Sequence, residues 1–239
     1  MRAADILDRH GAGWRSQVRV ASLGPDLFLH SAFPTDDPDS VFFGPDTYRF
    51  VRFIGKKAPG LSGARRVVDL GAGSGAGGIA AAKLIAGAQV TLVDPNGSAL
   101  RLARINAAVA GAKVEILHQD RLPPAADLVI ANPPYMMDSS GRTYRDGGDL
   151  LGGPIPLDWA RQALDTMSPG GTLLLYTGAA VADGEAPLVA ALRELCASQG
   201  AAIDVDEMDP DVFGEVLEEP PYAQVDRIAA LAIIIVKPT

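Results

Sequence analysis

The sequence predicts an α/β fold with a doubly wound, mostly parallel sheet of seven strands and an antiparallel last strand, preceded by a short N-terminal extension. Three observations lead to this prediction. Apolar runs of strand length alternate with helical patterns from residue 66 to residue 198. A glycine-rich turn follows the first of these strands, as in nucleotide-binding βα units. The last apolar run, residues 228–237, follows the previous strand with no helix between them, so we expect it to insert antiparallel into the sheet.

The elements of this sheet follow one another in a regular order. Strands are predicted at residues 66–70, 89–94, 113–118, 127–131, 172–177, 202–205 and 228–237. Helices are predicted at residues 79–85, 98–110, 157–167 and 185–198. Crossovers between parallel strands are right-handed. The pattern therefore predicts a Rossmann-like sheet with helices on both faces.

The residues before the first sheet strand are expected to form an extension. Residues 1–14 have the pattern of a short amphipathic helix ended by glycines. Two short strands are predicted at residues 17–20 and 27–30, around a turn, and residues 41–47 lead into a helix. Ala58-Pro59-Gly60 ends that helix. We therefore expect residues 1–57 to form the extension and residues 58–239 the main domain.

Composition and charge narrow the functional classes. The chain has 239 residues, 48% of them hydrophobic, and a formal net charge of −8, which disfavours broad nonspecific binding to nucleic acid. Six cations and no acid fall between residues 47 and 68, so an anionic partner near that segment stays open. Cys196 is the single cysteine, and the N-terminus has no signal-peptide core, which predicts a cytoplasmic protein with no disulfide. The three histidines have no metal-ligand spacing, and no metal is expected.

The segment D-L-V-I-A-N-P-P-Y, residues 127–135, combines a buried parallel strand with an abrupt stop. Ligands of open parallel sheets bind beyond the carboxyl ends of the strands. There the carboxamide oxygen of Asn132 and the carbonyl of Pro133 can accept the two hydrogens of a planar NH2 group. The ring of Tyr135 can stack on such a group. The alternative is an ordinary Pro-Pro turn after a strand, with Tyr135 as filler.

The glycine turn, residues 71–78, admits two interpretations. Gly73-Ser74-Gly75-Ala76-Gly77-Gly78 satisfies the dinucleotide fingerprint, and Asp94 stands where a ribose-hydroxyl acceptor belongs. However, Asp69 puts a carboxylate close to where a pyrophosphate would bind, and two anions repel. Asp120, after the third strand, can accept from an adenine amino group. A nucleoside that carries a cationic amino acid instead of phosphates is S-adenosylmethionine.

Four motifs in order, D-L-G-A-G-S-G, V-D-P-N, H-Q-D and A-N-P-P-Y, resemble those of the class I S-adenosylmethionine-dependent methyltransferases. The N-P-P-Y form and the A-R-I-N-A segment, residues 103–107, are similar to the branch that methylates planar nitrogens. The resemblance implies a catalytic set of Asn132, Pro133, Pro134 and Tyr135. It also implies a set of cofactor-binding residues, which includes some neighbours of the motif residues: Asp69, Gly71, Gly73, Gly75, Asp94, Pro95, Asp120, Arg121 and Asn132.

Within this branch, V-F-F-G-P-D-T and R-D-G-G-D look like the HemK-type glutamine methyltransferases of peptide-release factors. This chain departs from that family at Phe43 and Gly44, where the family usually has a Pro-Arg pair. The family also has an N-terminal helical bundle that docks its protein substrate, and the roughly 40 residues before Val41 leave little room for one. The resemblance favours a protein glutamine amide as methyl acceptor. An exocyclic amino group of a nucleic-acid base or a small-molecule amine stays open. A nicotinamide-dependent enzyme or a noncatalytic nucleotide-binding module is the other class.

The glycine- and serine-rich segment of residues 136–154 lies between a strand and a helix. Such a composition predicts a substrate-side lid that orders on binding. We expect Arg142 and Arg145 to face the acceptor.

Overall fold

Seven strands form one sheet in the order β10-β11-β9-β8-β5-β6-β7 in the computed structural model, which describes residues 6–35, 37–137 and 153–239. The strands are β5 (Arg66–Leu70), β6 (Gln89–Asp94), β7 (Val114–His118), β8 (Leu128–Ala131), β9 (Thr172–Val181), β10 (Ala202–Asp209) and β11 (Arg227–Val236). The pairs among β5 to β9 are all parallel, whereas β11 runs antiparallel between β9 and β10. The predicted sheet and the insertion of its last strand are confirmed.

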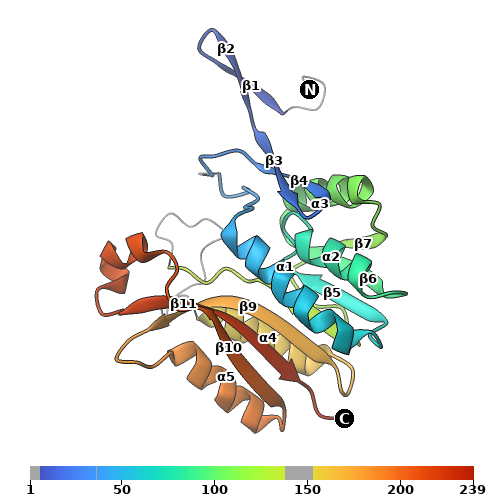
Figure 1. Cartoon of the computed structure of the whole chain (residues 1–239), viewed down its shortest axis with the longest axis vertical. Helices are drawn as coiled ribbons and strands as arrows, with labels where there is room; N and C mark the ends of the chain where they lie inside the picture. Colours follow the sequence, from blue (N-terminus) through green and yellow to red (C-terminus); the bar gives the residue numbers. More distant parts are fainter. Residues whose placement is uncertain (1–5, 36, 138–152) are drawn as a thin grey trace.

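In the described part of the chain, five α-helices cover the two faces of the sheet (Figure 1). They are α1 (Pro45–Lys57), α2 (Ala76–Leu84), α3 (Gly97–Ala110), α4 (Pro154–Thr166) and α5 (Pro187–Ser198). Alternate residues of β8 face opposite sides: Leu128 packs in a cluster with α1 and α2, and Val129 packs in a cluster with α4 and α5. The sheet is therefore doubly wound, as predicted. Among the described residues, no helix has the length and apolar character needed to cross a membrane.

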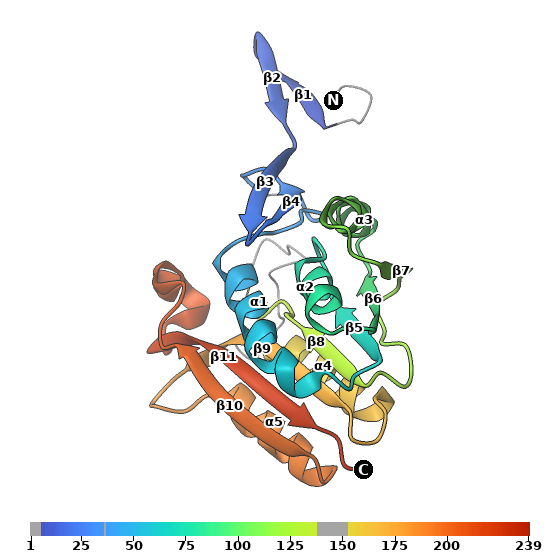
Figure 2. The same ribbon diagram turned by 45° about the vertical axis from the view of Figure 1, so that its right-hand side comes forward.

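The N-terminal extension consists of two hairpins, which project beyond the end of the sheet in both views (Figures 1 and 2). β1 (Leu7–His10) pairs with β2 (Gly13–Ser16), and β3 (Val18–Leu23) pairs with β4 (Asp26–Ser31). The helix predicted for residues 1–14 is therefore wrong in its described part. Gly11 has a φ of 57°, which reverses the chain, and a helix this short cannot repay its nucleation cost.

Asn106 on α3 joins the second hairpin to the glycine turn. Its carboxamide oxygen accepts from Leu29 N–H at 2.8 Å, and its Nδ2 donates to the carbonyls of Leu29 at 3.0 Å and Ser74 at 2.9 Å. The side chain is buried, and its bond to the Ser74 carbonyl is buried, while the two bonds to Leu29 are partly buried. The extension is thus attached at the turn that begins α2. A domain boundary between residues 57 and 58 stays a prediction.

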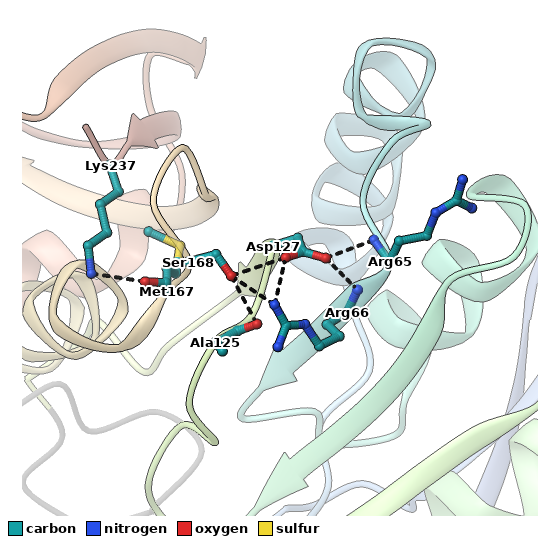
Figure 3. Close-up of polar contacts among 7 residues, drawn as sticks. All are labelled: Arg65, Arg66, Ala125, Asp127, Met167, Ser168 and Lys237. Atoms are coloured by element: carbon teal, nitrogen blue, oxygen red, sulfur yellow. Dashed lines mark hydrogen bonds and ion pairs between the residues drawn. The ribbon is translucent and has the colours of Figure 1, made fainter. Parts of the chain in front are cut away.

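Asp127 joins the amino-terminal ends of β5 and β8, at the end of these strands away from the glycine turn (Figure 3). Its Oδ2 accepts from the backbone N–H groups of Arg65 at 3.0 Å and Arg66 at 2.9 Å, and its Oδ1 accepts from Ser168 Oγ at 3.1 Å. Partial burial raises the pKa of Asp127, but these hydrogen bonds outweigh it and hold the pKa below its usual range. These contacts help to fix the register of β5 and β8, in which the last residues of the two strands, Leu70 and Ala131, pair with each other.

Candidate active site

A cavity of about 270 Å³ lies at the carboxyl ends of β5, β6 and β8. Its wall comes from the glycine turn, the loop before α1, the start of α3 and one side chain of α4. The lining residues are Asp39, Ser40, Val41, Phe42, Thr47, Phe50, Asp69, Gly71, Ala72, Gly73, Ser74, Ala76, Gly77, Asp94, Pro95, Asn96, Ala99, Asn132, Pro134 and Trp159. Residues from three of the four motifs, D-L-G-A-G-S-G, V-D-P-N and A-N-P-P-Y, thus meet in one place, whereas the H-Q-D residues do not line the cavity.

The glycine turn brings bare backbone to this cavity. Gly71 has a φ of 70°, and its N–H donates to the Val93 carbonyl at 2.8 Å, which ties the turn to β6. Gly75 has a φ of 82° and does not line the cavity; a Cβ there would lie 3.1 Å from Ala103 Cβ. Gly71 therefore shapes the wall, whereas Gly75 lets α2 pack closely against α3.

Asp94 ends β6 at the cavity wall. Its Oδ2 accepts from Gly73 N–H at 2.8 Å, and its Oδ1 accepts from Asn96 N–H at 2.8 Å. Burial raises the pKa of Asp94, while the two backbone donors oppose that rise. Each carboxylate oxygen has a further lone pair, so the side chain can also accept from the hydroxyls of a ribose.

Asp69 lies deeper, one residue before the end of β5. Its side chain is buried, and its Oδ2 accepts from Gly78 N–H at 2.6 Å, in the first turn of α2. Burial, with a smaller contribution from Asp94, raises the pKa of Asp69 to about 7, although the Gly78 hydrogen bond works against this. The carboxyl group therefore holds the glycine turn onto the strand and titrates near neutral pH.

Three further members of the predicted cofactor set have different positions. Pro95 lines the cavity, and its carbonyl lies 2.7 Å from His118 Nε2. Asp120 and Arg121 are exposed after β7 and do not line the cavity, although the carbonyl of Arg121 accepts from Gln119 Nε2 at 2.6 Å. An adenine contact at Asp120 stays a prediction.

The Asn132–Tyr135 segment divides between cavity and core. Asn132 and Pro134 line the cavity, whereas Pro133 and Tyr135 are buried. This alternation is what extended backbone produces, since successive side chains point to opposite sides. Among the described residues, no hydrogen-bond partner occupies the carboxamide of Asn132. Its donor and acceptor groups are therefore available to a ligand.

Tyr135 occupies a different place from the one expected of a stacking ring. Its hydroxyl donates to Asp46 Oδ2, and its ring covers Gly178, where a Cβ would lie 2.2 Å from Tyr135 Cε2. Tyr176 Oη donates to the other oxygen of Asp46 at 2.7 Å. Burial raises the pKa of Tyr135, and the neighbouring carboxylate raises it further. In this arrangement Tyr135 anchors the segment to α1 and β9, and its ring is not available to stack in the cavity.

The sequence analysis did not assign several residues near the site. Trp159 of α4 covers Gly71, and Phe42, from the V-F-F-G-P-D-T segment, lines the cavity. Tyr222, in a segment with no recognisable motif, accepts from Met137 N–H at 2.7 Å directly after the N-P-P-Y residues. The pattern of an amphipathic helix predicts that an aromatic residue packs in the core, so the sequence did not distinguish Trp159 from residues that only pack.

Most of the predicted lid, residues 136–154, lies outside the residues that the structure describes. Arg142 and Arg145 lie among residues 138–152, which are outside the described ranges. Met136, at the start of the segment, is buried, and Pro154 begins α4. The ordering of this segment on binding stays a prediction.

Comparison with known proteins identifies the central part of the chain. Residues 54–146 match the methyltransferase small domain. The release factor glutamine methyltransferase of Geobacter sulfurreducens is 33% identical over 130 residues, which are 48% of this chain and 46% of that protein. The ribosomal RNA large subunit methyltransferase G of Streptomyces griseus is 39% identical over 119 residues, 41% of this chain and 31% of that protein. The chain thus spans about half or less of the length of these relatives.

Solved structures show the same fold. The wild-type Trm5b structure from Pyrococcus abyssi superposes with a TM-score of 0.62 at 16% identity, over 97% of this chain and 62% of that chain. At this identity the likeness concerns the fold and not the substrate. The matched segment, residues 54–146, contains the glycine turn, Asp94 and Asn132.

Proposed function

Because the chain is related to the class I S-adenosylmethionine-dependent methyltransferases, close to the HemK type, we propose that it transfers a methyl group from S-adenosylmethionine to a planar nitrogen. The observation that carries this proposal is the meeting of Asp94, the glycine turn and Asn132 around one cavity. A donor and an acceptor must share such a place for the methyl group to pass between them.

The residues of the cavity fit this donor. The carboxylate of Asp94 suits the ribose hydroxyls, and the backbone at Gly71 and Gly73 lets an amino acid moiety approach. Asp69 favours a cationic ligand over a pyrophosphate, because a phosphate beside it would be repelled. When bound, S-adenosylmethionine supplies a methyl group activated by its sulfonium. Positions of the donor set that do not line the cavity, Asp120 and Arg121, are proposed to contact the adenine side.

The acceptor side depends on Asn132 and the backbone after it. Its carboxamide oxygen accepts one hydrogen of the target NH2 group, and the Pro133 carbonyl is proposed to accept the other. An amide nitrogen is a poor nucleophile because its lone pair is delocalised. Two acceptors orient the nitrogen and favour its pyramidalisation, which exposes the lone pair to the methyl group. No general base is required to initiate this attack.

We propose a protein glutamine amide as the acceptor. The similarity to a release factor glutamine methyltransferase supports this choice, as does the net charge of −8, which disfavours a polyanion. The second candidate, an exocyclic amine of an RNA base, is favoured by the similarity to a ribosomal RNA methyltransferase. The two share the same planar NH2 chemistry.

The test has two stages. Thermal shift with S-adenosylhomocysteine and with NAD separates the donor classes, and we expect protection by S-adenosylhomocysteine alone. Labelled methyl transfer into cell extract, followed by separate protease and nuclease digestion, then identifies the acceptor. Label released by protease supports a protein acceptor. Protection by NAD alone contradicts the methyltransferase proposal, and label released only by nuclease contradicts the glutamine acceptor.

A further inference from the structure

We propose that the indole of Trp159 faces the sulfonium of the methyl donor and selects the charged donor over its neutral product by a cation–π contact. This inference rests on the proposed function of the cavity. It concerns a residue of α4 that lies outside the four motifs and outside the matched small domain.

The position of Trp159 is defined by its contact with Gly71. A Cβ on Gly71 would lie 2.2 Å from Trp159 Cη2 and 2.8 Å from Cζ3, so the indole covers the side of this glycine where a side chain would project. Gly71 directly follows Leu70, which pairs with Ala131, and Ala131 directly precedes Asn132. The indole and the carboxamide of Asn132 therefore border the same end of the cavity.

That end is where the methyl group has to pass. Asp94, the ribose ligand of the proposal, ends β6, on the other side of β5 from Asn132. A donor that extends from Asp94 toward Asn132 crosses the end of β5, at Gly71. Its sulfonium, which lies between the ribose and the transferable methyl group, is thereby brought to the indole.

The other aromatic rings of the described cavity wall do not cover the end of β5. The ring of Phe50 lies over Gly77, in the first turn of α2, where a Cβ would lie 2.6 Å from its Cε1. Phe42 folds over Gly44, in the loop before α1, where a Cβ would lie 2.4 Å from its Cζ. Tyr135 does not line the cavity, because its hydroxyl contacts Asp46 and its ring covers Gly178. Trp159 is thus the described ring that covers the end of β5.

The charges of the wall make this contact useful. The described carboxylates that border the turn, Asp69 and Asp94, are both engaged by backbone N–H groups. Burial raises the pKa of Asp69 to about 7, which lowers the negative charge that this group offers a cation near neutral pH. The face of an indole is electron-rich and attracts a cation without a charge of its own.

This arrangement has a consequence for turnover. As the methyl group bonds to the acceptor nitrogen, the sulfur keeps the electron pair of the broken C–S bond and becomes a neutral thioether. The nitrogen releases its proton to solvent. A cation–π contact is lost in that step, so Trp159 favours the donor over S-adenosylhomocysteine, the product.

The experiment measures dissociation constants for S-adenosylmethionine and S-adenosylhomocysteine by calorimetry. Trp159→Leu removes the ring, Trp159→Phe keeps a smaller ring and most of the volume, and Phe42→Leu is the matched control on another wall. We expect Trp159→Leu to weaken S-adenosylmethionine roughly fivefold or more, and S-adenosylhomocysteine less than about twofold, with Trp159→Phe intermediate. Phe42→Leu should leave the ratio of the two constants unchanged.

A second measurement reports the contact directly. Trp14 and Trp159 are the two tryptophans of the chain, so a Trp14→Phe background leaves Trp159 as the single indole fluorophore. Its emission should change more with S-adenosylmethionine than with S-adenosylhomocysteine. Equal responses to both ligands, or equal weakening of both in Trp159→Leu, would overturn the inference and leave the proposed function intact. Failure of the wild-type chain to bind either ligand would overturn the proposed function itself.

Discussion

The glycine turn with Asp94 and the Asn132–Tyr135 segment differ in how their residues reach the cavity. Asp69, Gly73 and Asp94 are spread over 26 positions of the chain, yet all of them line the cavity. Four consecutive residues of the second region divide equally, with Asn132 and Pro134 at the cavity and Pro133 and Tyr135 buried.

The two regions differ because one is built from the ends of several parallel strands and the other from a single extended segment. Parallel strands bring their carboxyl ends to one edge, so residues at strand ends converge whatever their separation in sequence. Extended backbone alternates its side chains, so adjacent motif residues diverge. The motifs that follow β5, β6 and β8 therefore meet at one cavity, but a motif does not assign each of its side chains to the ligand.

The largest expected effect separates the acceptor role of Asn132 from donor binding. Asn132→Ala should reduce methyl transfer by roughly 10²-fold or more, as when one transition-state hydrogen-bond partner is removed. Donor affinity should stay within a few-fold. Single-turnover transfer to the identified acceptor, beside donor titration, measures both quantities. Asn132→Asp keeps an acceptor and should retain partial activity. A loss of donor affinity in proportion to activity would place Asn132 in the donor site or the fold.

The second prediction concerns the donor end of the comparison. Asp94→Ala should weaken donor binding by roughly 1–3 kcal/mol, since charged hydrogen bonds to the ribose are lost. Asp94→Asn is the matched control, because its single carbonyl oxygen keeps one acceptor and should cost less. Calorimetric titration measures the affinity. An unchanged dissociation constant for the donor in Asp94→Ala would contradict the assignment of Asp94 to the ribose.

The third prediction tests the buried half of the motif. Tyr135→Phe and Tyr176→Phe each remove one donor from Asp46, so each should lower the free energy of unfolding by roughly 1–3 kcal/mol. Chemical denaturation measures this change. Methyl transfer by Tyr135→Phe should remain within a few-fold of wild type, as for Tyr176→Phe. A Tyr135→Phe enzyme of wild-type stability and much lower activity would show that the hydroxyl acts on the ligand.

The smallest expected effect is a pH dependence at Asp69. Burial raises the pKa of this carboxyl group in the folded chain to about 7, from an ordinary value of 3.8, so the folded state keeps a proton that the unfolded chain releases. Its contribution to stability is fully present below about pH 4 and is lost as pH rises through about 7. Melting temperatures from pH 5 to 8 should fall relative to Asp69→Asn, which has no such group. Parallel curves for the two proteins would contradict the raised pKa.

The same group should couple pH to donor binding. A cationic donor favours the ionised carboxylate, so donor affinity should rise as pH increases through about 7 and then level. The Asp69→Asn variant should show a flatter profile. Titrations at several pH values provide the comparison.

The sequence by itself determined the sheet and its inserted last strand, and it indicated the residues after β5, β6 and β8 that border the proposed site. These depend on local patterns: apolar runs of strand length, helical periodicity and glycines after strands. The same local reasoning was wrong for residues 7–16, where pairing between two short segments with glycines at the turn outweighed an amphipathic pattern.

Only the tertiary structure decided which side chains face the cavity. The contact between Tyr135 and Asp46 joins residues 89 positions apart, and the indole over Gly71 comes from a helix with no motif. Contacts of this kind depend on packing between elements, because a side chain goes to the side where burial and hydrogen bonding are both satisfied. No local pattern records that choice, so only the fold shows that Trp159 covers Gly71 and that Asp46 accepts from Tyr135.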